Sequence, residues 1–179
     1  MRRVGRGRTG PGVRPDAVVS TSGRSHVLYE DEGTTTEAGY VVRVPVRWSD
    51  MDVFAHINHA RMVTLIEEAR IPWLFYDERP TAALRRGCVV TDLHVRYREQ
   101  VRHDEGPIVV TMFVEQLRAV DFTVGYEVRR GTDGPDAKPA VTATTQLVAF
   151  DVEAQRLRRL TAAEKEYLAS FRRDHRVTR

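Results

Sequence analysis

The sequence predicts an α+β fold, in which an antiparallel sheet of about five strands wraps around one long central helix, with a second helix near the C-terminus. In five segments apolar and polar residues alternate, which is the period of a strand. Between the first two of these segments, apolar residues recur at helical spacing. The last four strands follow one another without an intervening helix, as is typical of an antiparallel sheet.

The first strand begins at Tyr40, where every second residue is apolar as far as Trp48. Pro45 lies in this segment and has no N–H to donate, so we expect an edge strand or a bulge. A largely apolar helix follows the next loop and should be deeply packed; its helically spaced apolar residues are Met62, Leu65, Ile66, Ala69 and Trp73. Pro72 should kink this helix or mark its end.

Four further strands are expected at residues 89–98, 108–117, 122–129 and 140–151. Thr161 followed by Glu164 matches a capping box and predicts a helix that runs to about Arg173. One helix cannot cover both faces of a five-stranded sheet, and one sheet edge is left unpaired. We therefore expect a homodimer or a homotetramer.

Composition and charge predict one globular domain with a basic tail. Residues 1–39 are rich in Gly, Arg, Ser and Thr and lack periodicity, so we expect a disordered tail, with the domain at 40–152 and a terminal helix and basic end at 153–179. The net charge of +3 belongs to the two ends of the chain, which lack interleaved aromatic residues, so no nucleic-acid partner is expected.

Nothing in the sequence indicates export or a membrane partner. No apolar run approaches the ~20 residues of a membrane-spanning helix, and the Arg-rich start precedes no hydrophobic segment of a signal peptide. The single cysteine, Cys88, excludes an internal disulfide and is expected to be a small buried residue. We predict a cytoplasmic protein.

The densest cluster of ionisable groups lies between the first strand and the main helix, and it contains Asp50, Asp52, His56 and His59. Such a cluster at a strand-to-helix junction is typical of a functional site. Asn58 or His59 begins the helix, where free N–H groups and the positive end of the helix dipole favour a developing oxyanion. A carboxylate just upstream can then act as nucleophile or as general base for water.

This segment resembles the signature of the hydroxybenzoyl-CoA thioesterase branch of hot-dog proteins. The residues that carry the resemblance are Val46-Arg47-Trp48-Ser49-Asp50-Met51-Asp52, Ala55-His56-Ile57-Asn58-His59-Ala60-Arg61 and Glu67-Glu68-Ala69-Arg70. By element order the resemblance covers about residues 40–152. It implies a hot-dog fold and an acyl-CoA thioesterase, which hydrolyses the thioester to a free carboxylic acid and CoA. It also implies no metal or other cofactor and a substrate bound between subunits.

The resemblance assigns a role to each residue. Asp52 matches the catalytic aspartate, and Asp50 matches the other acid of the pair, which is more often structural. His59 stands where the family uses a backbone N–H to polarise the thioester carbonyl, and its imidazole would shape the acyl pocket. Ala55 departs from the pattern because glycine is usual there, and its methyl group is expected to narrow the loop or to change its backbone angles.

Other residues are predicted to bind the substrate. Asn58 and His56 belong to the same loop, where His56 is expected to brace the loop rather than to act as a second base. The acidic body of the chain needs local positive charge to hold the CoA phosphates. The candidates for this contact are Arg96, Arg98, Arg129 and Arg130.

Several alternatives stay open. The two aspartates could be turn and cap residues only, and Glu67 or Glu68 on the main helix could supply the carboxylate, as in another hot-dog branch. A metal site is disfavoured because no cysteine joins the cluster and a fourth ligand, such as His94, would have to come from afar. The alternative function is a non-catalytic hot-dog module that binds acyl-CoA, which would not need the carboxylate of Asp52. A hydratase or dehydratase is a minor third option, because its hydration motif is not clearly present.

Overall fold

The computed structural model describes residues 33–134 and 136–173; the greater part of the predicted tail, 1–32, and the basic end, 174–179, lie outside the described residues. The α-helices are α1 (His59–Arg70) and α2 (Ala162–Ala169). The strands are β1 (Thr34–Thr36), β2 (Gly39–Val44), β3 (Cys88–Tyr97), β4 (Ile108–Leu117), β5 (Asp121–Arg129), β6 (Val141–Asp151) and β7 (Arg156–Leu157). None of the described helices is long and apolar enough to cross a membrane.

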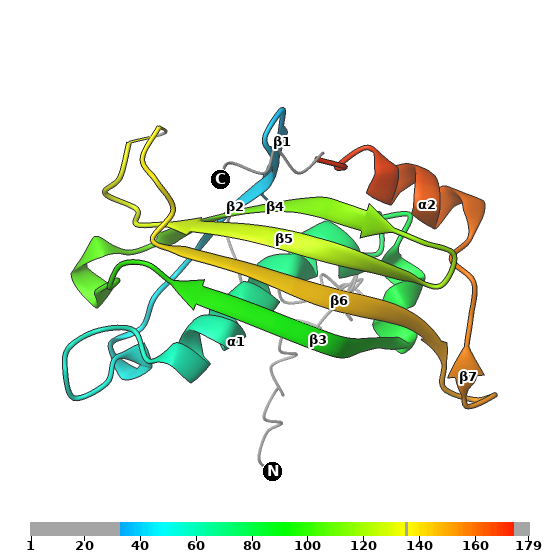
Figure 1. Ribbon diagram of the computed structural model, residues 1–179, viewed down its shortest axis with the longest axis horizontal. Coiled ribbons are helices and arrows are strands. Elements are labelled where there is room, and N and C mark those ends of the chain that lie inside the picture. The colour runs from blue at the N-terminus through cyan, green and yellow to red at the C-terminus, as the bar shows by residue number, and fades with distance from the viewer. Residues whose placement is uncertain (1–32, 135, 174–179) are drawn as a thin grey trace, which may run out of the picture.

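The strands form one antiparallel sheet in the order β1-β2-β4-β5-β6-β3, and β7 pairs with β6 (Figure 1). The predicted α+β class is confirmed, but the sheet has seven strands rather than about five. The two additional strands are short, and neither the Thr34–Thr36 segment nor Arg156–Leu157 contains alternating apolar residues. The strand Thr34–Thr36 lies inside the segment 1–39 that we predicted to be a disordered tail.

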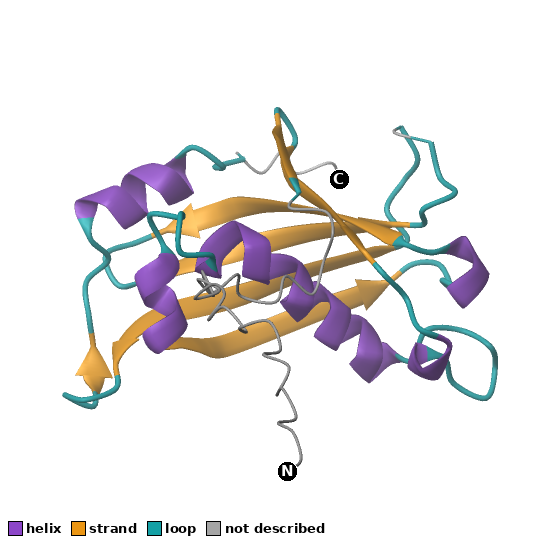
Figure 2. Ribbon diagram, turned by 180° about the vertical axis from the view of Figure 1, so that it is seen from behind, coloured by secondary structure: helices purple, strands orange, loops and turns teal. Residues whose placement is uncertain are grey.

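Helix α1 crosses one face of the sheet (Figure 2). Its apolar stripe is buried there, and Met62, Leu65, Ile66 and Ala69 are each 1–2% exposed. The helix continues beyond Arg70 into a π-helical turn, Ile71–Phe75, with Pro72 near its start, so the predicted change at this proline is confirmed. The first predicted strand is shorter than expected, because β2 ends before Pro45 and a 3₁₀ turn, Trp48–Asp50, follows.

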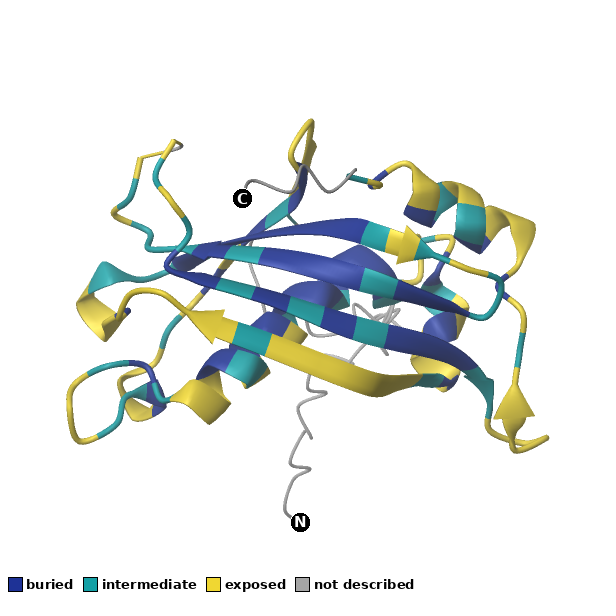
Figure 3. Ribbon diagram, in the orientation of Figure 1, coloured by how far each residue is buried: buried dark blue, intermediate teal, exposed yellow. Residues whose placement is uncertain are grey.

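Among the described strands, β3 lies at an edge of the sheet and pairs only with β6 (Figure 3). Its burial differs from that of the inner strands, because most of β3 is exposed whereas β4 and β5 are largely buried. The large apolar side chains exposed on β3 are Val89, Val90, Leu93 and Tyr97, with exposed fractions of 41–46%.

Helix α2 is tied to the sheet by a buried ion pair. The Thr161 capping box is present as predicted, but the helix ends at Ala169 rather than near Arg173. Glu164 is 1% exposed and accepts hydrogen bonds of 2.9 and 2.7 Å from the two terminal nitrogens of Arg158. Burial alone would raise the pKa of Glu164, but hydrogen bonds from Arg158 and the Thr161 backbone lower it below its ordinary value.

We expect Glu164→Gln to destabilise the protein by about 3 kcal/mol at neutral pH, because it leaves Arg158 without its charged partner. Because the pKa is lowered in the folded state, this advantage of the parent should be complete above the ordinary glutamate pKa of about 4.3. It should shrink as the pH falls through the lowered folded-state value. Urea unfolding of both proteins across this range measures the difference, and a difference independent of pH would contradict the assignment.

Candidate active site

The loop between β2 and α1 closes into a tight hairpin of backbone hydrogen bonds. Met51 and Ile57 form an antiparallel bridge, and the N–H of Asp52 donates to the carbonyl of His56 at 2.8 Å. The N–H of Asn58 donates to the carbonyl of Asp50 at 2.9 Å. Asp52 is therefore held near the first residue of α1, although it precedes His59 by seven positions in the sequence.

The Asp52 carboxylate is half-buried and is held by its own loop. One oxygen, Oδ1, accepts hydrogen bonds from the backbone N–H groups of Phe54 at 2.9 Å and His56 at 3.4 Å. Within the part of the chain that the structure describes, Oδ2 has no hydrogen-bond partner. The carboxylate is thus oriented through one oxygen while the other remains available for a water molecule or a carbonyl carbon.

Asp50 and Ala55 shape the same hairpin. Asp50 is 6% exposed, and its Oδ2 accepts the Arg47 N–H at 2.8 Å, as suits a bracing residue. Ala55 has a φ of 59°, in the left-handed region that glycine adopts without strain, and its side chain is exposed. Ala55 therefore adopts a conformation suited to glycine.

Asn58 caps α1, and its side-chain oxygen accepts the Ala60 N–H at 2.9 Å. Its carbonyl accepts the Met62 N–H, whereas the N–H of His59 has no acceptor among residues 33–134 and 136–173. The Tyr97 hydroxyl donates to the carbonyl of His59 at 2.8 Å and so ties the helix start to the end of β3. The His59 N–H is thus a free backbone donor at the helix N-terminus, beside the hairpin that carries Asp52.

An open pocket of about 580 Å³ lies between this hairpin and the segment after β3. The two segments are joined by a hydrogen bond of 2.8 Å from the Ile57 N–H to the Val101 carbonyl. His56 and Arg98, both predicted to bind the substrate, line the pocket together with Glu99, Gln100, Arg102, Glu105 and Arg130. Arg96, also predicted to bind the substrate, is not among the residues that line the pocket.

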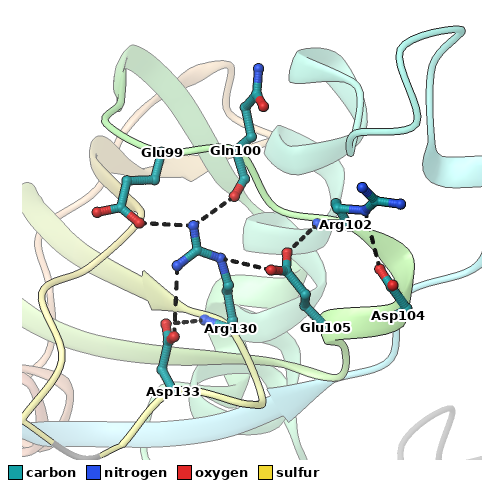
Figure 4. A network of polar contacts seen from close by, with 7 residues as sticks. All are labelled: Glu99, Gln100, Arg102, Asp104, Glu105, Arg130 and Asp133. Atoms are coloured by element: carbon teal, nitrogen blue, oxygen red, sulfur yellow. Dashed lines mark hydrogen bonds and ion pairs between the residues drawn. The ribbon is translucent and has the colours of Figure 1, made fainter.

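Arg130 links the segments that line this pocket through a network of polar contacts (Figure 4). Its guanidinium contacts Glu99 at 2.8 Å, Glu105 at 3.3 Å and Asp133 at 3.6 Å, and it donates to the Gln100 carbonyl at 2.9 Å. Because three carboxylates surround it, Arg130 is a brace rather than a free anion site. Arg129 is engaged in the same way, by Glu127 and the Ala137 carbonyl.

The remaining pocket arginines differ in whether a carboxylate pairs with them. Arg102 forms an exposed ion pair with Asp104 at 3.4 Å, whereas Arg98 forms no ion pair with any residue that the structure describes. Sequence reasoning missed Arg102, Glu105 and Gln100, because no periodicity marks a loop of polar residues. The hydrogen bond that brings this loop to the hairpin uses only backbone atoms.

The other sequence candidates lie apart from the hairpin. Glu67 on α1 is exposed and pairs with Arg70 at 3.4 Å. His94 faces away from α1 on β3, opposite Thr144 in register. Cys88 is half-buried, and burial raises its pKa to about 11. Among the described residues, no three His, Cys, Asp or Glu side chains gather where they could hold a metal ion.

The fold is shared with solved structures of thioesterases. A thioesterase of Thermus thermophilus, crystallised with coenzyme A and zinc, is 21% identical, with a TM-score of 0.61 over 73% of this chain and 92% of that chain. A probable thioesterase of Escherichia coli is 20% identical, with a TM-score of 0.61 over 73% and 97%. A DHNA-CoA thioesterase of Staphylococcus aureus is 22% identical, with a TM-score of 0.55 over 67% and 79%.

Among curated proteins, no sequence matches this chain. The model of the thioesterase-like superfamily, by contrast, matches residues 46–171, which is most of the described chain. This span includes the hairpin, α1 and the sheet from β3 to β7. The predicted hot-dog fold and thioester hydrolase class are thereby confirmed at the level of the family. The chain belongs to the thioesterase-like superfamily.

Proposed function

We propose that the protein is an acyl-CoA thioesterase in which Asp52 is the catalytic carboxylate. The observation that carries this proposal is the carboxylate's geometry: Oδ1 is fixed by two backbone N–H groups while Oδ2 is free, beside the N-terminus of α1. Family membership supports the reaction class, and the structure with coenzyme A from Thermus thermophilus supports CoA as the thiol component.

In the proposed mechanism the thioester carbonyl oxygen accepts the free N–H of His59 at the positive end of the helix dipole. Asp52 Oδ2 takes a proton from a water molecule, whose oxygen attacks the carbonyl carbon. The tetrahedral intermediate then expels the CoA sulfur, which receives the proton from Asp52, and the carboxylic acid that remains loses its own proton to the solvent. Direct attack by Asp52 would give the same products through an anhydride that water then opens.

We place the CoA end of the substrate in the pocket beside the hairpin. His56 belongs to both the hairpin and the pocket, so a ligand there lies next to Asp52. Arg98 supports phosphate binding because its charge is not matched by a carboxylate, unlike those of Arg129 and Arg130. A guanidinium without an internal partner can bind phosphate oxygens through two parallel hydrogen bonds.

We also propose that two protomers associate through β3, giving a homodimer or a pair of dimers. The outer edge of this ten-residue strand is unpaired within the described residues, and its apolar side chains are exposed. An exposed, long, apolar edge strand is a ready template for pairing with a second chain. Because Tyr97 ends β3 and bonds α1 at His59, such an interface would pass beside the proposed site.

A non-catalytic acyl-CoA-binding module is the second candidate. It would use the same pocket, and the neutralised Arg130 network is as suitable for binding as for catalysis. The two functions differ only in whether the free oxygen of Asp52 takes part in hydrolysis. The activity of the Asp52→Asn variant decides between them.

Asp52→Asn should lower kcat by at least ~10²-fold, or about 3 kcal/mol of barrier, because an amide can neither accept the proton from water nor attack a carbonyl. Substrate affinity should change little, because the two side chains are nearly isosteric. A thiol-release assay over short, long and aromatic acyl-CoA esters measures the effect. Asp50→Asn is the matched control and should lower turnover less but stability more. Near-parental rates for Asp52→Asn would contradict the assignment, and Glu67 or Glu68 would then be tested as the catalytic carboxylate.

Arg98→Met should raise KM for acyl-CoA by roughly fivefold at unchanged kcat, since an exposed charge contact contributes up to about 1 kcal/mol. The loss should diminish at high salt, where the contact is screened. Arg96→Met, two residues earlier in the chain and outside the pocket lining, is the control and should match the parent. Equal KM values in the two variants would remove Arg98 from the CoA site.

Light scattering at micromolar concentration should give the mass of a dimer or of a multiple of it. Leu93→Arg should dissociate the assembly, because it places a charge on the proposed apolar interface. Leu157→Arg, the same substitution on exposed β7, is the matched control and should not change the mass. A monomeric parent protein would remove both the β3 interface and a site shared between subunits.

A further inference from the structure

Arg70 is buried at the end of α1 with an incompletely compensated charge. Its side chain is 6% exposed, and its one ion pair within the described chain joins Nη2 to Glu67 Oε1 at 3.4 Å. The Glu67 side chain is 65% exposed, so this pair is screened by water and offsets little of the cost of burying a guanidinium. The Nε of Arg70 is buried and has no hydrogen-bond partner within the described chain.

Two buried hydroxyl groups face the same place from the sheet. Tyr126 on β5 is 1% exposed, and its hydroxyl makes no hydrogen bond of standard geometry to any described residue. Thr145 on β6 is 2% exposed. Burial raises the pKa of Tyr126, while nearby Arg70 and Thr145 act to lower it, so the three groups lie close together. Buried donors without acceptors are uncommon in native proteins, and a further polar group bound beside these two would satisfy them.

Apolar side chains lie along α1 and β3 on the side of this cluster that leads to the proposed oxyanion donor. At about 1.5 Å per residue, α1 carries Arg70 about 16 Å beyond His59. Val63 on α1 is half-buried, and Leu93 and Tyr97 on β3 are exposed. Leu93 is paired in register with Thr145, which puts an apolar side chain beside the polar cluster.

We propose that Arg70, Tyr126 and Thr145 bind an oxygen atom at the distal end of the acyl group. The preferred substrates are then acyl-CoA esters whose chain ends in a carboxylate, and next in a hydroxyl group, rather than in a methyl group. A carboxylate completes the charge of Arg70 from the buried side and accepts hydrogen bonds from Nε and from the two hydroxyls. Exposed Glu67 is free to turn toward water. The inference rests on the proposed function, because it takes the acyl group to start at His59.

The test compares chains of equal length with different ends. The monothioesters suberoyl-, sebacoyl- and dodecanedioyl-CoA are compared with octanoyl-, decanoyl- and dodecanoyl-CoA, and ω-hydroxy esters form a third series. At one length at least, kcat/KM should favour the carboxylate by at least about tenfold, because a site built on buried donors rejects an analogue that leaves them unpaired. Equal or faster cleavage of the hydrocarbon chain at every length would overturn the proposal.

Substitutions in the polar cluster test whether its hydroxyl groups recognise the terminal carboxylate. Tyr126→Phe and Thr145→Val each remove one hydroxyl at nearly constant volume, and both should reduce the preference for the carboxylate end, mainly through KM. Thr144→Val, on the opposite face of β6, is the matched control and should retain it. A simple loss of stability would lower the rates for both ends equally, leaving their ratio unchanged, and that result would contradict the proposal.

Binding measurements without hydrolysis test this inference separately from the proposed function. Calorimetric titration of Asp52→Asn with sebacoyl-CoA and decanoyl-CoA measures recognition without turnover. Tighter binding of sebacoyl-CoA, lost in the added Tyr126→Phe change, supports the polar cluster even if no ester is hydrolysed by the parent. Equal affinities would overturn the cluster whether or not the parent is an active thioesterase.

Discussion

The burial of α1 against the sheet is the interaction on which the rest of the structure depends. Each of its large apolar side chains contributes about 1.5–3 kcal/mol when fully buried. A hydrogen bond of the hairpin contributes about 1 kcal/mol net. The packing of Met62, Leu65 and Ile66 therefore sets the position of the helix, and the loops at its N-terminus adjust to it. Because the helix begins where β3 ends, the hairpin that precedes it meets the loop that follows β3.

The sequence analysis predicted the fold well where side chains repeat regularly. Alternation located the five long strands, because a strand with one buried face must alternate. It did not find β1 or β7, because three threonines and an Arg-Leu pair show no apolar alternation, although both segments pair with neighbouring strands. The same limit applies to the site: the residues of the hairpin were found through their motif, whereas the loop that meets it at Val101 carries no comparable pattern.

The arginines divide by how well their charges are matched. Arg130 is surrounded by three carboxylates and Arg158 by the buried Glu164, so both hold elements of the fold together. Arg98 has no such partner in the described chain, and Arg70 has only an exposed one. Sequence alone cannot make this division, because neighbouring Arg129 and Arg130 and distant Arg98 look alike as charged residues near strand ends. Whether a carboxylate from another segment pairs with an arginine decides if that arginine stabilises the fold or can bind an anion.

Ala55 shows how strongly the hairpin is determined. A residue other than glycine in the left-handed region costs roughly 1–2 kcal/mol. The conformation persists because Ala55 donates to the Asp52 carbonyl at 3.0 Å, while the N–H groups on either side of it, from Phe54 and His56, both point to the Asp52 carboxylate. A relaxed φ at Ala55 would turn these donors away, and the cost of the strain is less than that of the bonds lost together. Since the methyl group is exposed, the strain is borne by the backbone of the loop, and the carboxylate keeps its orientation.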